Sequence, residues 1–460
     1  MADDRAGNVE LGVMTGPVDL PAALAVMMRR LLGDGDLTDL RRLSGGANME
    51  SWAFDWGGEG YVLRRAPSAE YMADRPFGHA DEAALVRAAH AAGVKAPEVV
   101  GVLAEADGMG TGYLMRRVDA EVNPARILAD PPPSLLSDLA LELARIHAVP
   151  LASIPDAIPL MDTAAALAEL KARFIGYDGD RPIIALAIRW CEENLPAPTG
   201  SVLVHGDYRM GNIMVDANGL AAVLDWELAH RGDAHEDLAF GCMAVWRFGR
   251  LDHLAFGVGD LEEFFNLYEA AGGVSVDRQR FRFWLVYRTL WWALGCLQMG
   301  AAWRSGADRS VERVVVGRRT AEQELDLLAL LESEAPAAAR EAALPAANRA
   351  PAEAAGEPTN GEIVQAVRDW IDMAIKPHAE GHAKFEAVVA MNALGIVARD
   401  LEAGVRAEDA DLARALLGGE RTLAEPGLLA RLRRAALDKC AVDSPKYPPL
   451  ARARAAWGMQ

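Results

Sequence analysis

The sequence predicts an α+β protein: a strand-rich N-terminal region, a mostly helical region, and a small all-α C-terminal domain. Three observations predict this. Short alternating apolar segments fill the chain up to about residue 115, apolar spacings of three and four residues follow the three prolines at 131–133, and residues 332–360 consist largely of Ala, Pro and Glu without an aromatic side chain. The segment 332–360 would bury too little apolar surface to offset the entropy lost on ordering it, so it is predicted to be a linker.

Each element of the N-terminal region has its own local signal. In chain order we expect a helix over 21–32, strands over 51–55 and 61–65, a helix over 79–92, and strands over 99–103 and 113–115. The strands alternate apolar and polar residues, and glycines mark the turns between them. The second helix places Ala84, Leu85, Ala88 and Ala89 on one face and ends at Gly93.

The helical region contains a short β island. A helix is clearest over 135–148, and strands are predicted over 201–204, 213–216 and 221–224. The last two flank Ala217-Asn218-Gly219, which is an Asn-Gly hairpin signal. Beyond the linker, helical periodicity predicts two helices within 361–402 and shorter ones at about 409–417 and 428–437.

Composition excludes some classes of protein. The 460 residues carry 47 Lys and Arg against 66 Asp and Glu, a net charge of −19, which argues against a nucleic-acid-binding surface. The first five residues lack the basic character of a secretory signal, and the longest apolar run, 289–303, is shorter than the about 20 residues that a membrane span needs. The four cysteines lie far apart. We therefore expect a cytoplasmic protein with no membrane partner.

The strongest chemical signal is the segment HGDYRMGN at 205–212. It places a carboxylate at Asp207 and an amide five residues later at Asn212, and Asp225 follows at the end of the predicted hairpin. This is the order found in kinases, where one acid accepts the proton of the acceptor hydroxyl and an amide and a second acid hold magnesium. The alternative is that Asp207 and Asp225 only cap turns.

Residues 35–330 resemble the aminoglycoside-phosphotransferase and choline-kinase group, and most closely its branch found with acyl-CoA dehydrogenases. The resemblance is carried by residues 43–48, 61–67, 205–216, 224–230, 232–238 and 245–250. It implies a bilobal protein-kinase-like fold, with a β-rich N-lobe and a helical C-lobe, and it is less specific for the acceptor than for phosphoryl transfer.

The resemblance also implies roles for individual residues. Asp207 would be the catalytic base, and Asn212 and Asp225 would hold Mg²⁺ on ATP. Glu82 would form an ion pair with a cation of the preceding strand. The other nucleotide-binding residues implied are Ser44, Gly45, Gly46 and Asn48, whose backbone would cover the phosphates, and Met115 and Val118, in the segment that would bind adenine.

One position departs from the family pattern. The family's strand lysine is replaced by Arg64, which can still attract phosphate but has a different geometry. Arg64 is preferred to Arg65 on the motif alignment alone, and a surface arginine pair is the alternative.

Two further acids have structural alternatives. Asp237 is predicted to cap a helix or anchor a loop, and Glu227 either reaches a second metal or is structural.

Three aromatic residues, Tyr287, Trp291 and Trp292, follow at helical spacing. Core packing is the default interpretation, although in this fold such helices often line the acceptor cleft.

The predicted function is transfer of the γ-phosphoryl group of Mg-ATP to a small-molecule hydroxyl. The resemblance suggests a hydroxyacyl-CoA, whose phosphates could meet Arg247 and Arg250 or Arg116 and Arg117. An aminoglycoside or another alcohol is an alternative acceptor, and a catalytically silent nucleotide-binding scaffold is an alternative of another class.

The predicted domain boundaries are an ATP-binding lobe over 1–118, a catalytic and acceptor lobe over 119–331, the linker over 332–360 and an accessory domain over 361–460. The accessory domain resembles a small helical domain that accompanies these phosphotransferases, either fused or as a separate chain. It is expected to pack on the kinase lobes or on another subunit.

Overall fold

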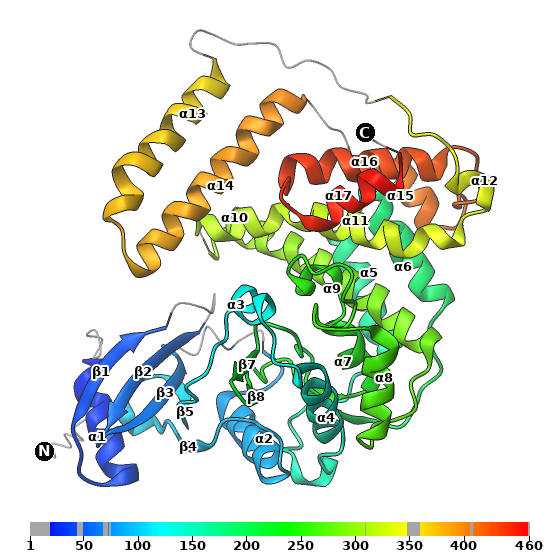
Figure 1. Ribbon diagram of the computed structural model, residues 1–460. Helices are drawn as coiled ribbons and strands as arrows, with labels where there is room; N and C mark the ends of the chain where they lie inside the picture. Colours follow the sequence, from blue (N-terminus) through cyan, green and yellow to red (C-terminus); the bar gives the residue numbers. More distant parts are fainter. Residues whose placement is uncertain are drawn as a thin grey trace, which may run out of the picture. The chain divides into compact units, whose positions relative to one another are not determined.

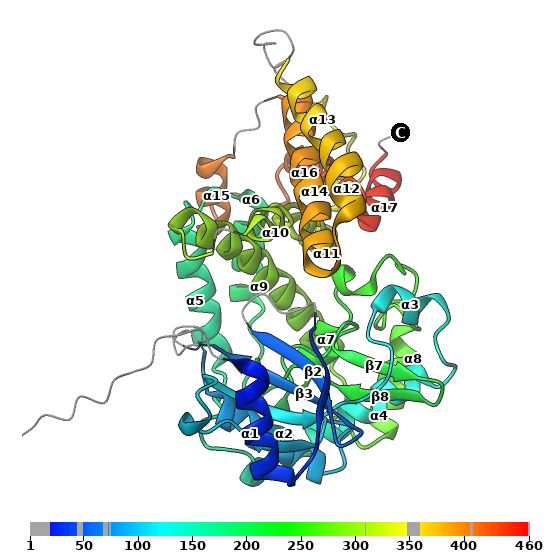
Figure 2. The ribbon, with the colours of Figure 1, turned by 90° about the vertical axis from the view of Figure 1, so that its left-hand side faces the viewer.

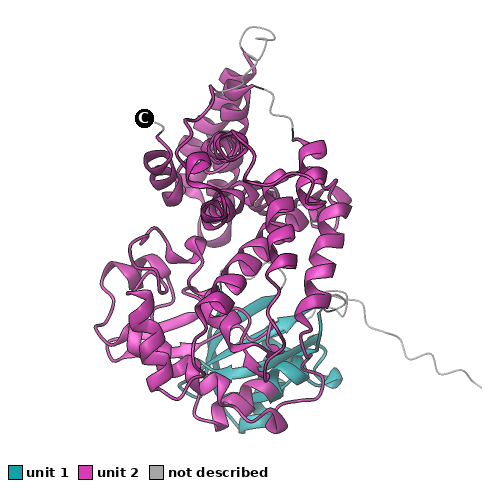
Figure 3. Cartoon of the chain, turned by 90° about the vertical axis from the view of Figure 1, so that its right-hand side faces the viewer, with its two compact units in different colours: residues 1–84, 97–118 teal, residues 85–96, 119–460 magenta. Residues whose placement is uncertain are grey.

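The computed structural model describes residues 19–43, 49–67, 72, 75–308, 310–346, 359–404 and 408–458. The chain divides into two compact units, shown in different colours in Figure 3. Unit 1 comprises residues 1–84 and 97–118, and unit 2 comprises residues 85–96 and 119–460. The predicted glycine turn, Ser44 to Asn48, lies outside the described residues.

Unit 1 is built around a five-stranded antiparallel sheet in the order β1-β2-β3-β5-β4 (Figure 1). Its strands are β1 (Leu37–Arg42), β2 (Glu50–Trp56), β3 (Glu59–Ala66), β4 (Val99–Val102) and β5 (Thr111–Arg116). Helix α1 (Leu20–Leu32) precedes the sheet, and the first turns of α2 (His79–Ala91) belong to the same unit. The predicted strands and both predicted helices are present, with ends shifted by at most two residues.

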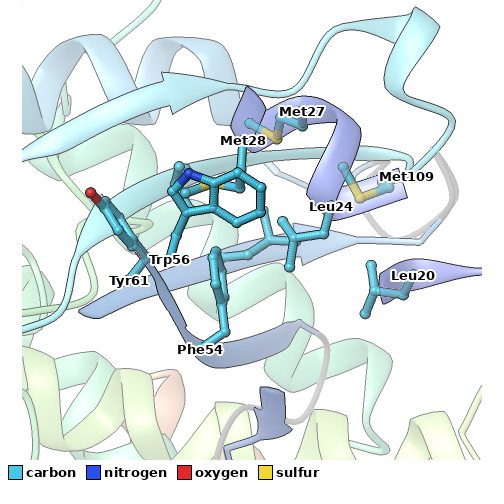
Figure 4. Close-up of a cluster of buried hydrophobic side chains, with 10 residues drawn as sticks. Leu20, Leu24, Met27, Met28, Phe54, Trp56, Tyr61 and Met109 are labelled. Carbon is cyan, nitrogen blue, oxygen red and sulfur yellow. The ribbon is translucent and has the colours of Figure 1, made fainter. Parts of the chain in front are cut away.

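The core of unit 1 lies between α1 and the sheet (Figure 4). Leu24, Met27 and Met28 of α1 are fully buried because spacings of three and four residues place them on one face of a helix. They pack with Phe54 and Trp56 of β2, and the latter side chain is 4% exposed. The side chain of Asp19 caps the first turn of α1 through the N–H of Ala22.

Unit 2 is mainly helical and carries two small two-stranded sheets. Before the accessory domain its helices are α3 (Pro124–Ala129), α4 (Leu135–His147), α5 (Thr163–Gly176), α6 (Pro182–Glu193), α7 (Ala234–Phe240), α8 (Leu261–Ala270), α9 (Arg278–Ser305), α10 (Val311–Arg318) and α11 (Thr320–Leu331). Strand β6 (Val202–Val204) pairs with β9 (His230–Gly232), and β7 (Ile213–Asp216) pairs with β8 (Gly219–Val223).

The predicted hairpin is present as β7 and β8. Asp216 pairs with Gly219, so the connection is Ala217-Asn218, and Gly219 has φ +110°. Strand β9 was not predicted, because three residues are too short for an alternating pattern to show.

The C-terminal part of unit 2 is all helical, in agreement with the predicted α+β class. Its helices are α12 (Ala337–Arg340), α13 (Asn360–Trp370), α14 (Gly381–Ala403), α15 (Ala410–Leu417), α16 (Leu428–Asp443) and α17 (Pro448–Ala456). Helices α13 and α14 lie side by side in both Figure 1 and Figure 2. Helix α16 is six residues longer than predicted, and α17 was not predicted.

Helices of the accessory domain pack on the rest of unit 2. Helices α16 and α17 both contact α11, and α15 contacts α6. Lys439 of α16 forms ion pairs with Glu324 of α11 and with Glu408, and Arg433 of α16 pairs with Glu332. Among the described residues, no helix is both long and apolar enough to cross a bilayer.

Candidate active site

The 205–212 loop connects β6 to β7 and carries the predicted catalytic acid. Pairing of Ile213 with Val223 aligns β7 with β8, and the N–H of Leu224 donates to the carbonyl of Asn212 at 2.8 Å. The hairpin therefore brings Asn212 and Asp225, which are 13 positions apart in the sequence, to neighbouring strand ends. This closeness follows from register and not from any local preference.

The carboxylate of Asp207 is held on both oxygens. The Nδ2 of Asn212 donates to Oδ2 at 2.6 Å, and the Nε of Arg209 donates to Oδ1 at 2.7 Å. Asp207 is only 9% exposed, and this burial raises the pKa of its carboxyl above the ordinary value. Arg209 opposes that effect, and the negative charge of Asp225 adds to it. The structure thus brings the three predicted residues together.

Asp225 adopts a left-handed backbone conformation, with φ +66°. Few non-glycine residues take this conformation, although Asp does so more often than most, and such residues cluster at functional sites. Within the described part of the chain, the Oδ1 atom of Asn212 accepts no hydrogen bond. A carboxylate and a free amide oxygen are the hard oxygen ligands that Mg²⁺ prefers, so these two residues fit the expected metal.

Asp237, at the buried centre of α7, anchors the 205–212 loop. Its carboxylate accepts hydrogen bonds from the N–H of His205 at 2.7 Å and of Gly206 at 2.9 Å, and it also contacts His147 Nε2 at 3.3 Å. Burial acts to raise the pKa of Asp237, but the bonds from His147 and His205 outweigh it and lower the pKa. Asp237 is therefore a loop anchor, one of the two structural roles predicted for it.

A second anchor was missed in the sequence. Arg288 of α9 is 4% exposed, and it donates to the carbonyl of Gly206 at 2.5 Å and to Glu236 at 3.1 Å. The only signal in the sequence was a single arginine within the mostly apolar stretch 283–297. Asp237 and Arg288 thus hold the N–H and the C=O of the same glycine, which fixes the backbone just before Asp207.

Aromatic side chains pack around the arginine that bonds to Asp207. The Cζ atom of Arg209 lies 4.3 Å from the ring centroid of Trp246, on the 3₁₀ helix η4 (Ala244–Arg247), and Trp246 contacts Trp292 at 5.4 Å between centroids. Trp291 covers the guanidinium of Arg288 at 4.2 Å. Tyr287 is 2% exposed and packs on Phe283 and Trp284, so it is a core residue.

In unit 1, Arg64 and Glu82 form the ion pair that the resemblance implied. The Nε of Arg64 lies 3.5 Å from Oε1 of Glu82, and Tyr113 donates to the same oxygen at 2.9 Å. Arg65 lies on the other face of β3, where it pairs with Glu50 at 2.8 Å. Alternation along the strand separates the two arginines, and only Arg64 meets the glutamate of α2.

Other predicted binding residues have different surroundings. Met115 is near the end of β5, and Val118 is the last residue of unit 1. Arg116 pairs with Glu59 and Glu98, and Arg117 pairs with Asp55 at 2.6 Å, so their charges are matched.

Arg247 and Arg250, which were predicted to meet the phosphates of an acceptor, lie at the end of η4 and just after it. The guanidinium of Arg247 donates to the backbone carbonyl of Leu251, and that of Arg250 donates to the carbonyl of Leu128.

Comparison with known proteins identifies the family and the fold. The sequence model of the phosphotransferase enzyme family (APH) matches residues 39–284, and that of a domain of unknown function (DUF6285) matches residues 377–447. A solved structure of a candidate aminoglycoside phosphotransferase from Ralstonia eutropha JMP134 is 20% identical, with a TM-score of 0.52 over 68% of this chain and 98% of that one. This similarity confirms the predicted protein-kinase-like fold.

Two curated relatives bear the name predicted for the nearest branch. Acyl-CoA dehydrogenase family member 10 of Mus musculus is 27% identical over 45% of this chain and 21% of its own length. Acyl-CoA dehydrogenase family member 11 of Gallus gallus is 26% identical over 54% of this chain and 34% of its own length. The chain thus matches about a fifth to a third of these relatives.

Proposed function

The chain belongs to the phosphotransferase enzyme family, and we propose that it transfers the γ-phosphoryl group of Mg-ATP to the hydroxyl of a hydroxyacyl-CoA. That it is a phosphotransferase acting on an alcohol group follows from the family. The nucleotide, the metal and the acceptor are the proposal. The observation that carries it is the buried Asp207 carboxylate, held by Arg209 and Asn212 beside Asp225.

In the proposed reaction, Asp207 orients the acceptor hydroxyl and takes its proton as the oxygen bonds to the γ-phosphorus. The bond from that phosphorus to the bridging oxygen breaks, and ADP leaves with the electron pair. Desolvation of Asp207 supports this role, because a raised carboxyl pKa makes the group a better proton acceptor. The positive charge of Arg209 beside it acts against that rise in pKa.

Asn212 and Asp225 are proposed to hold the magnesium ion, which would neutralise charge on the phosphate oxygens when bound. Arg64, oriented by Glu82, is proposed to attract the phosphates in place of the usual lysine. Ser44, Gly45, Gly46 and Asn48 are proposed to cover the phosphates, and Met115 and Val118 to contact adenine. Both groups of residues are proposed on the resemblance alone.

The CoA ester is proposed because of the names of the two curated relatives and the charge near η4. Arg247 and Arg250 each donate to one backbone carbonyl, and a guanidinium carries five N–H donors. Their remaining donors suit the anionic phosphates of a CoA acceptor. They do not suit a cationic amino sugar.

The test is a turnover assay with Mg-ATP and a panel of hydroxyacyl-CoA thioesters, with one aminoglycoside included. We expect ATP-dependent phosphorylation of at least one thioester, and a loss of about 10²- to 10⁴-fold in kcat for Asp207→Ala. The matched control is Asp216→Ala, because Asp216 is an exposed acid on the same hairpin.

Each other outcome has a definite meaning. Phosphorylation of the aminoglycoside alone would replace the CoA proposal with the antibiotic one. No turnover of any acceptor by the wild type, together with measurable ATP binding, would favour the silent scaffold. Equal rates in the wild type and in Asp207→Ala would contradict Asp207 as the base.

A further inference from the structure

We propose that the last helix of the accessory domain, α17, is a positioning element for the acceptor side of the active site. Its contacts hold the segment 244–252, which begins with η4 and carries Trp246. The inference rests on the proposed function only where it concerns the acceptor, because the contacts themselves lie within unit 2.

Helix α17 is fixed to the rest of unit 2 at both ends. Tyr447, its N-cap residue, donates from Oη to Oδ2 of the buried Asp326 on α11. At the other end, Trp457 donates from Nε1 to Glu332 at 2.8 Å, and Arg433 of α16 bonds to the same carboxylate. Two buried or half-buried polar contacts thus set the position of a helix of nine residues.

Between these ends, α17 contacts the 244–252 segment directly. The Nη1 of Arg452 donates to the carbonyl of Leu251 at 3.2 Å, and that carbonyl also receives Nη1 of Arg247 at 3.3 Å. The ring of Pro448 lies beside Gly249, where an added Cβ would be 3.3 Å from its Cγ. The carbonyl of Leu251 is therefore held by Arg247 from within the segment and by Arg452 from the accessory domain.

The segment needs such support because its own conformation is unfavourable. Phe248 has φ +46° and Gly249 has φ +89°, and Phe248 is 44% exposed. A left-handed phenylalanine costs free energy that surrounding contacts must supply. Loops with few buried contacts open locally at a low cost in free energy. Loss of one hydrogen bond from α17 should therefore speed hydrogen exchange in the 244–252 segment.

The 244–252 segment is also connected to Asp207, the proposed base, through Arg209. Trp246 lies under the guanidinium of Arg209, and Arg209 bonds to Asp207. Arg247, next in the chain, interacts electrostatically with Asp326, the partner of Tyr447. A displaced 244–252 segment would move Trp246 and the two arginines proposed to meet the acceptor, and would leave Asn212 and Asp225 in place. Acceptor binding should therefore depend on α17, and ATP binding should not.

The experiment compares the full-length wild type with Arg452→Ala, Arg452→Lys and the double variant Tyr447→Phe/Arg452→Ala. The first readout is hydrogen–deuterium exchange of peptides covering 244–252. The second is the KM for the hydroxyacyl-CoA and for ATP. Arg414→Ala is the control, since Arg414 is an exposed arginine of α15 that pairs only with Asp411 among the described residues.

We expect Arg452→Ala to speed exchange in 244–252 and to raise the acceptor KM about two- to tenfold, the effect of losing one ordinary hydrogen bond. The double variant should show a larger effect, Arg452→Lys should restore part of it, and the ATP KM should stay within about twofold. Unchanged exchange in Arg452→Ala and in the double variant would overturn the inference. So would an equal rise in both KM values.

The two proposals can fail separately. If the wild type phosphorylates no acceptor, the proposed function fails, and the exchange experiment still decides whether α17 holds the segment.

Discussion

The Nε of Arg209 lies 2.7 Å from Oδ1 of Asp207, and the ring of Trp246 covers the same guanidinium. A single side chain, two residues after the proposed base, therefore joins that base to the aromatic part of the site. This relationship gives Arg209 a measurable role, because its positive charge lowers the pKa of a carboxylate whose pKa burial raises.

Replacing Arg209 with Gln should move the acidic limb of the kcat/KM profile to higher pH. The cation lowers the pKa of Asp207 against the effect of burial, so removing it lets that pKa rise further, and the base becomes ionised only at higher pH. The pH profile of phosphoryl transfer measures the shift. Arg189→Gln, which alters an exposed pair on α6, should leave the limb unchanged, and a shift to lower pH would contradict the assignment.

Gly206→Ala should disrupt the site although it adds only one methyl group. Gly206 has φ +79°, and an added Cβ would lie 2.4 Å from the carbonyl oxygen of Leu228. Gly272→Ala is the matched control, because Gly272 has φ +96° with no heavy atom within 4 Å and should cost only the conformational part, about 1–2 kcal/mol. Thermal unfolding should show a clearly larger loss for Gly206→Ala, with turnover abolished. Equal losses would refute this account.

Asp237→Asn should destabilise unit 2 by about 2–4 kcal/mol at neutral pH, because a buried carboxylate that accepts two backbone bonds becomes neutral. The pKa of Asp237 is lower in the folded state, so its ionised form contributes stability above its ordinary pKa. That contribution is lost as the pH falls through the folded-state value. Urea unfolding at several pH values should show the difference from wild type shrinking in acid. A constant difference would argue against a charge effect.

Arg64→Lys should retain activity within about tenfold of wild type, since a point charge can still attract phosphate, whereas Arg64→Met should lose about 10²- to 10³-fold. The KM for ATP in steady-state kinetics distinguishes the two. Arg41→Lys, at an exposed position on β1, is the control. Complete loss of ATP binding in Arg64→Lys would mean that the geometry of the fork, and not its charge, is required.

Asp326→Asn should reduce the loss of stability toward alkaline pH. Burial raises the pKa of Asp326 from its ordinary value of 3.8 to about 7, against the hydrogen bond from Tyr447. The folded state therefore binds the extra proton between these values, and the free energy of unfolding falls as the pH rises through that window. Thermal unfolding at about pH 5 and about pH 8 should show a smaller difference for the variant than for wild type. An unchanged difference would contradict the raised pKa.

The sequence by itself determined the local elements and which residues are proposed to react. Apolar alternation and periodicity are short-range properties, so β2, β3, α2, α4 and the β7–β8 hairpin could be predicted to within a few residues. Asp207, Asn212 and Asp225 could be proposed from the sequence because the chemistry of phosphoryl transfer calls for these residue types in this order.

Only the tertiary structure decided which buried charges hold the loop and what α17 contacts. Arg288 is 82 residues from Gly206, and Arg452 is 201 residues from Leu251. Neither pairing leaves a local pattern in the chain. Each hydrogen bond depends on how helices pack, and packing is set by the sum of many distant contacts.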